Sequence, residues 1–171
     1  MRKAMKIIAT LLLVAGLAIL LYPHIRQLLY RQYARGMIAS FEERLKESED
    51  DSLRWLYLLM VEYNEHLYKN DQENLVDALS YSQVDFSLRQ FGFDEEMIGY
   101  IEIPKMNIEL PIFLGANDEN MRRGAAHLTQ TSLPVGGMNT NSVIAAHRGM
   151  GTAAMFRDIE VLEVGDDLLL C

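Results

Sequence analysis

The sequence is poor in cysteine, and its first 41 residues include no acidic one. Cys171 is the single cysteine among 171 residues, so no disulfide can form within the chain and a disulfide-stapled scaffold is excluded. Half of the residues are hydrophobic, which is enough apolar material for a packed core and excludes global disorder. The length suits one domain of ordinary size with an appendage.

The acidic and basic residues are unevenly distributed along the chain. Six of the sixteen basic residues precede Glu42, which is the first acidic one. From residue 42 onward the chain has ten basic and twenty-four acidic residues, a net charge of −14. Such an acidic body repels a phosphate backbone, so nucleic acid is not expected as a partner.

Motifs for metals, phosphates and cofactors are also missing. His127 and His147 lie twenty positions apart, and neither His-x-x-x-His nor Cys-x-x-Cys spacing occurs, so we expect no metal site. Gly136-Gly137 lacks the Lys-Ser/Thr pair and the helix that a phosphate loop requires. We therefore predict a protein without a cofactor.

The longest apolar run extends from Ile7 to Tyr22 and predicts a membrane segment. Only Thr10 and Gly16 within it are not strongly apolar. A spanning helix needs about 20 residues, and this length is reached if the run extends to Ile25 while Lys6 snorkels outward.

A cleaved secretory signal is the competing interpretation of this run, since Gly16-Leu17-Ala18 offers small residues at the required alternation. The apolar stretch continues past them through residues 19–22, which favours an uncleaved anchor. Basic residues flank the run on both sides, so charge alone leaves its orientation open.

Two helices are predicted after the anchor, over residues 38–46 and 53–68. In the second, apolar residues recur at helical spacing, with Asn64 as the polar exception. Residues 48–52 supply N-cap and first-turn acidic groups. The expected product is a helical hairpin near the membrane, with His66 on its surface.

At about residue 98 the pattern changes from helical spacing to strict alternation. Ile101 and Ile103 belong to one predicted strand, residues 106–113 form the next, and Pro104-Lys105 joins them. Pro111 cannot donate to a ladder, so it indicates either an edge strand or an outward-facing unpaired position.

Shorter elements follow the two strands. Residues 117–123 predict a helix capped by Asn117 and ended by Gly124, and residues 132–137 predict a loop. A small buried strand over 143–146 then delivers His147 at its end. After a turn at Gly165-Asp166, a further strand begins and the chain stops on it, from which we expect a fragment of a β domain.

Six segments of the chain, taken in order, resemble the sortase family, and the class C, pilus-associated group most closely. They lie within residues 98–168 and comprise Ile98-Gly-Tyr-Ile-Glu-Ile-Pro-Lys105, the strand from Asn107 to Pro111, Leu114-Gly-Ala116, Gly124-Ala-Ala-His-Leu128, Thr131-Ser-Leu-Pro-Val-Gly-Gly137 and Ser142-Val-Ile-Ala-Ala-His-Arg-Gly149.

The resemblance implies a mainly β, sortase-type barrel, here incomplete and with its N-terminal strands only, preceded by a transmembrane helix and a helical hairpin or lid region. The expected division is an anchor over 1–30, a helical region over 31–97 and the N-terminal part of the catalytic β domain over 98–171.

The resemblance also implies a cysteine transpeptidase in the cell membrane, with its catalytic portion outside a Gram-positive-type cell. His147 matches the family's catalytic His, which protonates the leaving amine after a Cys thiolate attacks an LPXTG-like sorting signal. The expected partners are pilins carrying that signal, and a pilin Lys or a cell-wall peptide amine as acceptor.

Two parts of the family's catalytic set are not matched. The family's catalytic Cys and Arg lie several tens of residues beyond the position of His147, so we interpret Cys171 as a core residue or a truncation end. Neither Arg148 nor Arg157 matches the family Arg, and His127 is expected to be structural. The chain alone is therefore predicted to be inactive.

A lid is the third expectation from class C, in which an Asp-Pro-aromatic motif covers the active-site groove. Asp85 and Phe86 lie at the corresponding distance before Ile98 but lack the intervening Pro, so a lid and a plain loop remain open. The alternative to an enzyme is a degenerate sortase that acts only as a membrane scaffold or assembly protein.

Overall fold

The computed structural model describes residues 2–69, 88–91, 96–151 and 153–171. Helical elements come first and strands follow, which is the predicted order. The elements are α1 (Arg2–Glu47), α2 (Asp50–Lys69), η1 (Leu88–Phe91), β1 (Met97–Ile103), η2 (Pro104–Met106), β2 (Ile108–Leu114), α3 (Asp118–Arg123), β3 (Ala125–His127), β4 (Ile144–Ala145), η3 (Ile159–Val161) and β5 (Leu169–Leu170).

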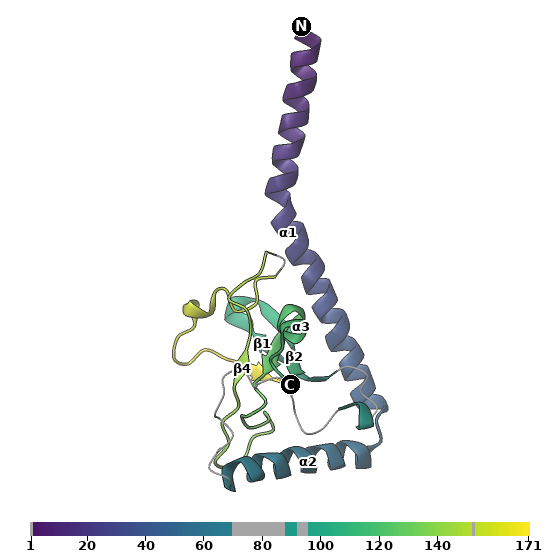
Figure 1. The fold of residues 1–171 in the computed structure, drawn as a ribbon, viewed down its shortest axis with the longest axis vertical. Coiled ribbons are helices and arrows are strands. Elements are labelled where there is room, and N and C mark those ends of the chain that lie inside the picture. The colour runs from purple at the N-terminus through teal and green to yellow at the C-terminus, as the bar shows by residue number, and fades with distance from the viewer. Residues whose placement is uncertain (1, 70–87, 92–95, 152) are drawn as a thin grey trace.

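Helix α1 unites the predicted membrane segment and the first predicted helix in one element of 46 residues that contains Pro23. Its N-terminal half projects away from the rest of the molecule (Figure 1), and its apolar side chains there are exposed. The helix first buries residues against the sheet at Ala34, Ile38 and Phe41. The apolar segment and the sheet are therefore joined by continuous helix.

Helix α2 begins at Asp50 with two acidic residues in its first turn, as predicted. It does not fold back along α1 near the apolar segment; it lies across the opposite end of the molecule (Figure 1). Because α1 continues for 25 residues after Tyr22, it carries the chain about 37 Å further at 1.5 Å per residue. The prediction of a hairpin beside the membrane was wrong for this reason.

Among the described residues the strands form one five-stranded sheet in the order β4-β3-β2-β1-β5. The neighbours β1 and β2 are antiparallel, as are β3 and β4, and β1 and β5. Strands β2 and β3 are parallel, and α3 connects them. The strands predicted from alternation are thus confirmed.

Pro111 lies inside the sheet, so its prediction as an edge-strand marker was wrong. It is opposite Tyr100 in the β1–β2 register, with β3 on the other side of β2. The N–H and C=O of Tyr100 both bond to Cys171, at 2.8 and 3.0 Å, and so point away from Pro111. The β2–β3 ladder starts one residue later, at Ile112. Pro111 is therefore unpaired, which explains how its missing N–H is tolerated, but it is buried and not outward-facing as predicted.

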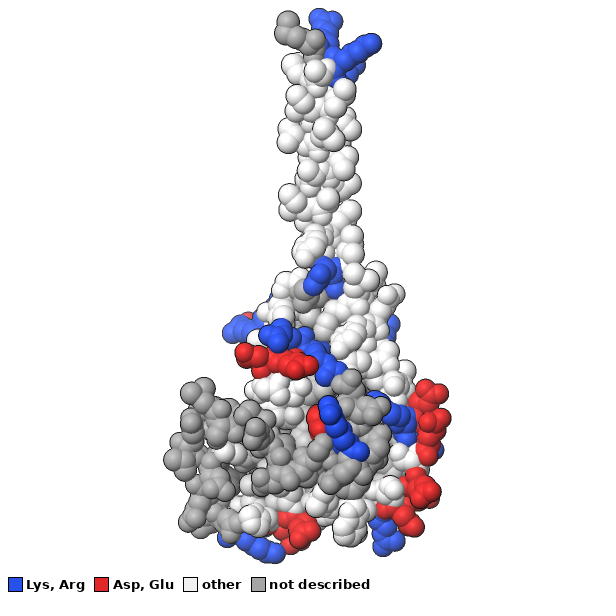
Figure 2. Space-filling model, turned by 45° about the vertical axis from the view of Figure 1, so that its right-hand side comes forward, with Lys and Arg blue, Asp and Glu red and all other residues white. Residues whose placement is uncertain are grey.

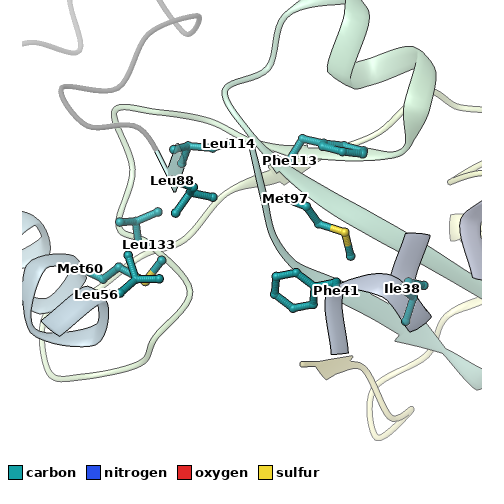
Figure 3. Close-up of a cluster of buried hydrophobic side chains, with 9 residues drawn as sticks. All are labelled: Ile38, Phe41, Leu56, Met60, Leu88, Met97, Phe113, Leu114 and Leu133. Carbon is teal, nitrogen blue, oxygen red and sulfur yellow. The ribbon is translucent and has the colours of Figure 1, made fainter. Parts of the chain in front are cut away.

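Two hydrophobic clusters lie in the domain, and β2 contributes to both. Residues in β1 alternate between buried and half-buried, whereas β2 is buried throughout its last five residues because both of its faces are covered. The first cluster joins α1, α2 and the sheet (Figure 3); it contains Ile38, Phe41, Leu56, Met60, Leu88, Met97, Phe113, Leu114 and Leu133. The second contains Ile101, Ile103, Leu110, Ile112, Ala125, Ala153 and Met155.

Helix α3 has the predicted ends. The side chain of Asn117 accepts from the N–H of Asn120 at 2.9 Å, and Gly124 closes the helix by donating to the Asn120 carbonyl at 3.0 Å. Gly124 is needed for space, because a Cβ there would lie 2.4 Å from the carbonyl oxygen of Pro111. A residue with a side chain would push β3 away from β2.

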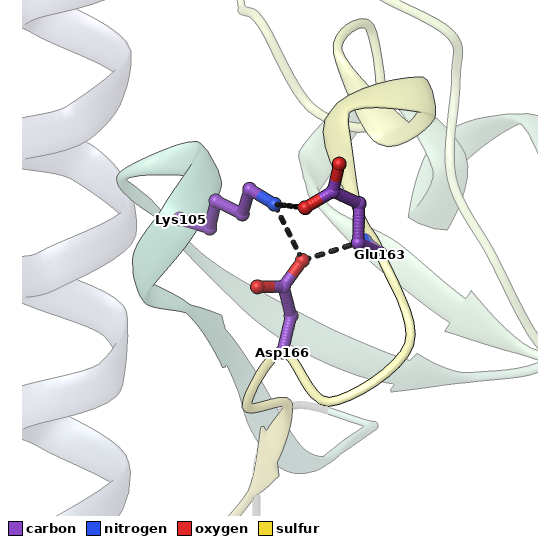
Figure 4. A network of polar contacts seen from close by, with 3 residues as sticks. All are labelled: Lys105, Glu163 and Asp166. Atoms are coloured by element: carbon purple, nitrogen blue, oxygen red, sulfur yellow. Dashed lines mark hydrogen bonds and ion pairs between the residues drawn. The ribbon is translucent and has the colours of Figure 1, made fainter.

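An ion-pair network holds the turn before β5 against the connection between β1 and β2 (Figure 4). Lys105 Nζ lies 3.1 Å from Glu163 Oε2 and 2.8 Å from Asp166 Oδ2, and Asp166 also accepts from the Glu163 N–H. The Lys105 cation holds the pKa of Asp166 below its usual range. These contacts fix where β5 meets β1.

Candidate active site

His147 follows β4, which is an edge strand of the described sheet. The pairing of Ala126 with Ala145 places the end of β4 beside β3. Ile144 and Ala145 are only half-buried because nothing described covers the outer side of β4, so the prediction of a buried strand was wrong. His147 leaves this strand with its side chain exposed. An exposed imidazole at a strand end can reach a substrate or a neighbouring group.

The loop after His147 holds its backbone in place. The Phe156 N–H donates to the His147 carbonyl at 3.0 Å, and Met150 and Ala153 exchange two backbone hydrogen bonds across the turn. Ala153 and Met155 are 1% exposed in the second hydrophobic cluster. The loop is therefore anchored in the core a few residues after the imidazole that it positions.

Two arginines flank this loop, and both are paired with acidic residues close in sequence. Arg148 contacts Glu160, and Arg157 lies 3.1 Å from Asp158. Gly149 permits the turn between them: its φ is +97°, and a Cβ there would lie 3.1 Å from the Cβ of Arg157. Neither arginine is engaged with His147 in the described contacts.

Cys171 lies at the other end of the strand order. Its backbone pairs with Tyr100 next to β5, so three strands separate β5 from the strand that precedes His147. The thiol is exposed, which contradicts the prediction of a core residue. It adjoins the Tyr100 phenol, whose pKa is raised chiefly by the hydrogen bond to Glu42 and further by burial and Cys171. No described contact joins Cys171 to His147.

His127 is fully buried at the end of β3. Its Nε2 lies 2.9 Å from the Ser132 carbonyl, which can only accept, so Nε2 carries the proton. Its Nδ1 has no partner in the described part of the chain, and burial lowers the pKa of the ring. These contacts support the predicted structural role.

Asn64, the polar exception among the apolar positions of the second predicted helix, holds the loop between β3 and β4 in position. It is 4% exposed, its Nδ2 donates to the Leu133 carbonyl at 3.0 Å, and its Oδ1 accepts from the Leu133 N–H at 2.7 Å. Tyr63 adds a hydrogen bond to the Thr129 carbonyl at 2.7 Å. Helix α2 therefore holds the connection between β3 and β4. In the sequence, the only sign of this contact was a polar residue at a position where the helical pattern expects an apolar one.

Two further predictions concern parts of the site. The proposed lid residues Asp85 and Phe86 lie outside the described residues. Within the described ranges no group of three or more His, Cys, Asp or Glu side chains is placed to hold a metal ion.

Comparisons with known proteins identify this fold. A half-barrel sheet in this strand order, preceded by helices, is the sortase architecture, and the sortase-domain family model matches residues 101–170. Sortase A of Bacillus anthracis is 29% identical over 105 residues, which cover 60% of this chain and 49% of that protein. This chain thus spans about half the length of that curated relative.

Solved structures of class C sortases give the same result over more of the chain. Sortase C1 of pilus island 1 of group B Streptococcus is 32% identical with a TM-score of 0.69, covering 80% of this chain and 69% of that one. Sortase C of Clostridium perfringens SM101 is 32% identical with a TM-score of 0.61, covering 79% and 67%. The chain belongs to the sortase family, and it resembles the class C members.

Proposed function

We propose that the protein is a membrane-anchored cysteine transpeptidase in which His147 transfers the proton. The observation that carries the proposal is the exposed imidazole at the end of β4, with its backbone held by Phe156, in a chain of the sortase family. The strand and the loop together fix the backbone of His147 and leave its imidazole accessible.

The proposed transpeptidation replaces one amide bond by another in two steps. A Cys thiolate attacks the Thr carbonyl of an LPXTG-like signal, and the imidazolium of His147 protonates the departing amine. An amine from a pilin Lys or a cell-wall peptide then attacks the thioester and releases the thiolate. The Cys and the oxyanion-stabilising Arg of the family are not matched among these 171 residues, so the activity is that of the complete protein and not of this chain alone.

Helix α1 is proposed as the anchor. It is the one helix in the described part of the chain that is long and apolar enough to cross a membrane, and no residue of its apolar window is buried. We place the sheet on the outer side of the membrane, where pilins and cell-wall peptides are found.

The test is turnover of a fluorogenic sorting-signal peptide, with an amine acceptor, by the product of the complete gene. We expect H147A to lower kcat/KM by about 10²- to 10⁴-fold, the usual contribution of general acid–base catalysis. H66A is the matched control, since His66 is exposed on α2. Equal turnover by H147A and the unmodified protein would refute the role of His147, and no turnover by either protein would favour the scaffold alternative.

A further inference from the structure

The apolar surface of α1 extends to the point where the helix meets the β domain. Leu28 and Leu29 are 58% and 55% exposed, and Tyr30 is the next residue. From Ile7 to Leu29 the helix has 23 residues and is about 34 Å long, close to the thickness of about 30 Å of a bilayer's hydrocarbon core. If α1 spans a membrane, the β domain therefore begins at the level of the lipid headgroups.

Contacts at this level join the helix directly to the domain. The Tyr30 hydroxyl donates to the Arg123 carbonyl at 2.9 Å, and Arg123 Nε donates to the Tyr33 hydroxyl at 3.3 Å. Ala34, one turn further, is 1% exposed. The last turn of α3, which carries Arg122 and Arg123, is thus held beside the part of α1 that leaves the membrane.

Several arginines lie at this level of the molecule, with acidic side chains beside them (Figure 2). Arg26 lies over the Tyr22 ring, 5.8 Å from its centroid, and Arg31 and Arg122 are exposed without an ion-pair partner among the described residues. Arg35 is 72% exposed and lies 3.6 Å from Glu109. Figure 2 shows basic side chains at the tip of the helix and again where the helix enters the domain, with an uncharged surface between them.

A hollow of about 140 Å³ opens beside these arginines, between α1 and the connection from β1 to β2. Tyr30, Arg31 and Arg35 line it from the helix, and Glu102 and Glu109 line it from the strands. Glu109 already lies against Arg35, whereas Arg31 at the rim has no ion-pair partner in the part of the chain that the structure describes. A guanidinium there can bind a phosphate oxygen in the bidentate geometry that arginine favours.

We propose that this juxtamembrane face, defined as Arg31, Arg35 and Arg122, binds the phosphates of anionic phospholipids and holds the β domain against the membrane. The proposal rests on the membrane anchor proposed above. Pro23 removes one helical hydrogen bond within α1, and the helix changes direction before it reaches the sheet (Figure 1). Headgroup binding selects the tilt in which the arginines lie at the surface.

The test uses the full chain with a donor fluorophore on Cys171, its single and exposed thiol. The protein is inserted into vesicles of phosphatidylcholine, with or without phosphatidylglycerol, that contain an acceptor-labelled lipid headgroup. We expect more efficient energy transfer with phosphatidylglycerol, and we expect high salt to abolish the difference. Each arginine near such a surface raises the ratio of docked to undocked protein by about fivefold. The triple variant R31Q/R35Q/R122Q should therefore lower this ratio by about a hundredfold.

A matched variant, K46Q/R54Q/K69Q, removes the same number of charges from α1's last turn and from α2, and should behave like the unmodified chain. The double variant R31Q/R122Q leaves the contact between Arg35 and Glu109 intact and should shift transfer in the same direction as the triple variant. Equal transfer in both lipids by a chain that resists alkaline extraction would overturn the headgroup contact alone. A chain that alkali extracts from both vesicles would overturn the anchor, and this proposal with it.

Discussion

The hydrogen bonds between Asn64 and Leu133 predict a large loss of stability on one substitution. Asn64→Leu keeps a side chain of similar volume but removes both the donor and the acceptor that Leu133 uses. Leu133 is 0% exposed, so its N–H would stay buried without a partner, whereas its C=O would keep the Val135 N–H at 2.8 Å. One such buried group costs about 1–3 kcal/mol, so we expect a loss of about 1–3 kcal/mol in the free energy of unfolding.

The assay is urea unfolding of the full chain in detergent micelles, combined with hydrogen exchange at the Leu133 amide. The variant should lower the urea midpoint and speed exchange at Leu133 more than at the amides of β1. E62Q is the control, because Glu62 is exposed on the same helix and such a change is worth at most about 0.5 kcal/mol. A loss below that value, with unchanged exchange at Leu133, would refute the claim that α2 holds this loop.

Three further predictions concern other parts of the chain. G124A should cost about 1–3 kcal/mol, because its methyl group would overlap the Pro111 carbonyl; G36A, where a methyl meets open space, should cost nothing in the same urea titration. Stability should fall as pH drops below about 6.5, because burial lowers the pKa of His127 and the unfolded chain then binds the extra proton. H127Q should flatten this dependence in urea midpoints measured against pH, and an unchanged slope would exclude His127 as its source. Incubation of this chain with a sorting-signal peptide should give no cleavage by mass spectrometry, and turnover that C171A abolishes would show that Cys171 is a nucleophile.

The strands and the helix cap were predictable from the sequence because they depend on local chemistry. Alternation at Ile101 and Ile103 reports directly which face of β1 is buried, and Asn117 caps its own helix three residues ahead. The start of α2 at its acidic residues follows from the same kind of local signal.

The features that were missed depend on contacts between distant segments. Pro111 is tolerated inside the sheet because the polar groups of Tyr100 point to Cys171, and alternation within β2 cannot report this. Asn64 is explained by Leu133, which lies 69 positions later. The uninterrupted α1 follows from packing of Ala34, Ile38 and Phe41 on the sheet, which no helical pattern near the anchor reveals.

At His147, too, the local position was predictable from the sequence and the surroundings were not. The sequence placed this residue at the end of a strand, and the structure shows that the strand is at an edge and that the loop after it is anchored by Ala153 and Met155.

The most direct measurement of the role proposed for His147 compares two substrates whose leaving groups differ in basicity. The product of the complete gene, with and without H147A, is assayed near pH 6.5, where an ordinary imidazole is about half protonated, on a sorting-signal amide and on the matching activated ester. An ester leaving group departs without a proton, so H147A should lose most of its activity on the amide and keep most of it on the ester. Equal losses on both substrates, or none on either, would contradict proton transfer by His147.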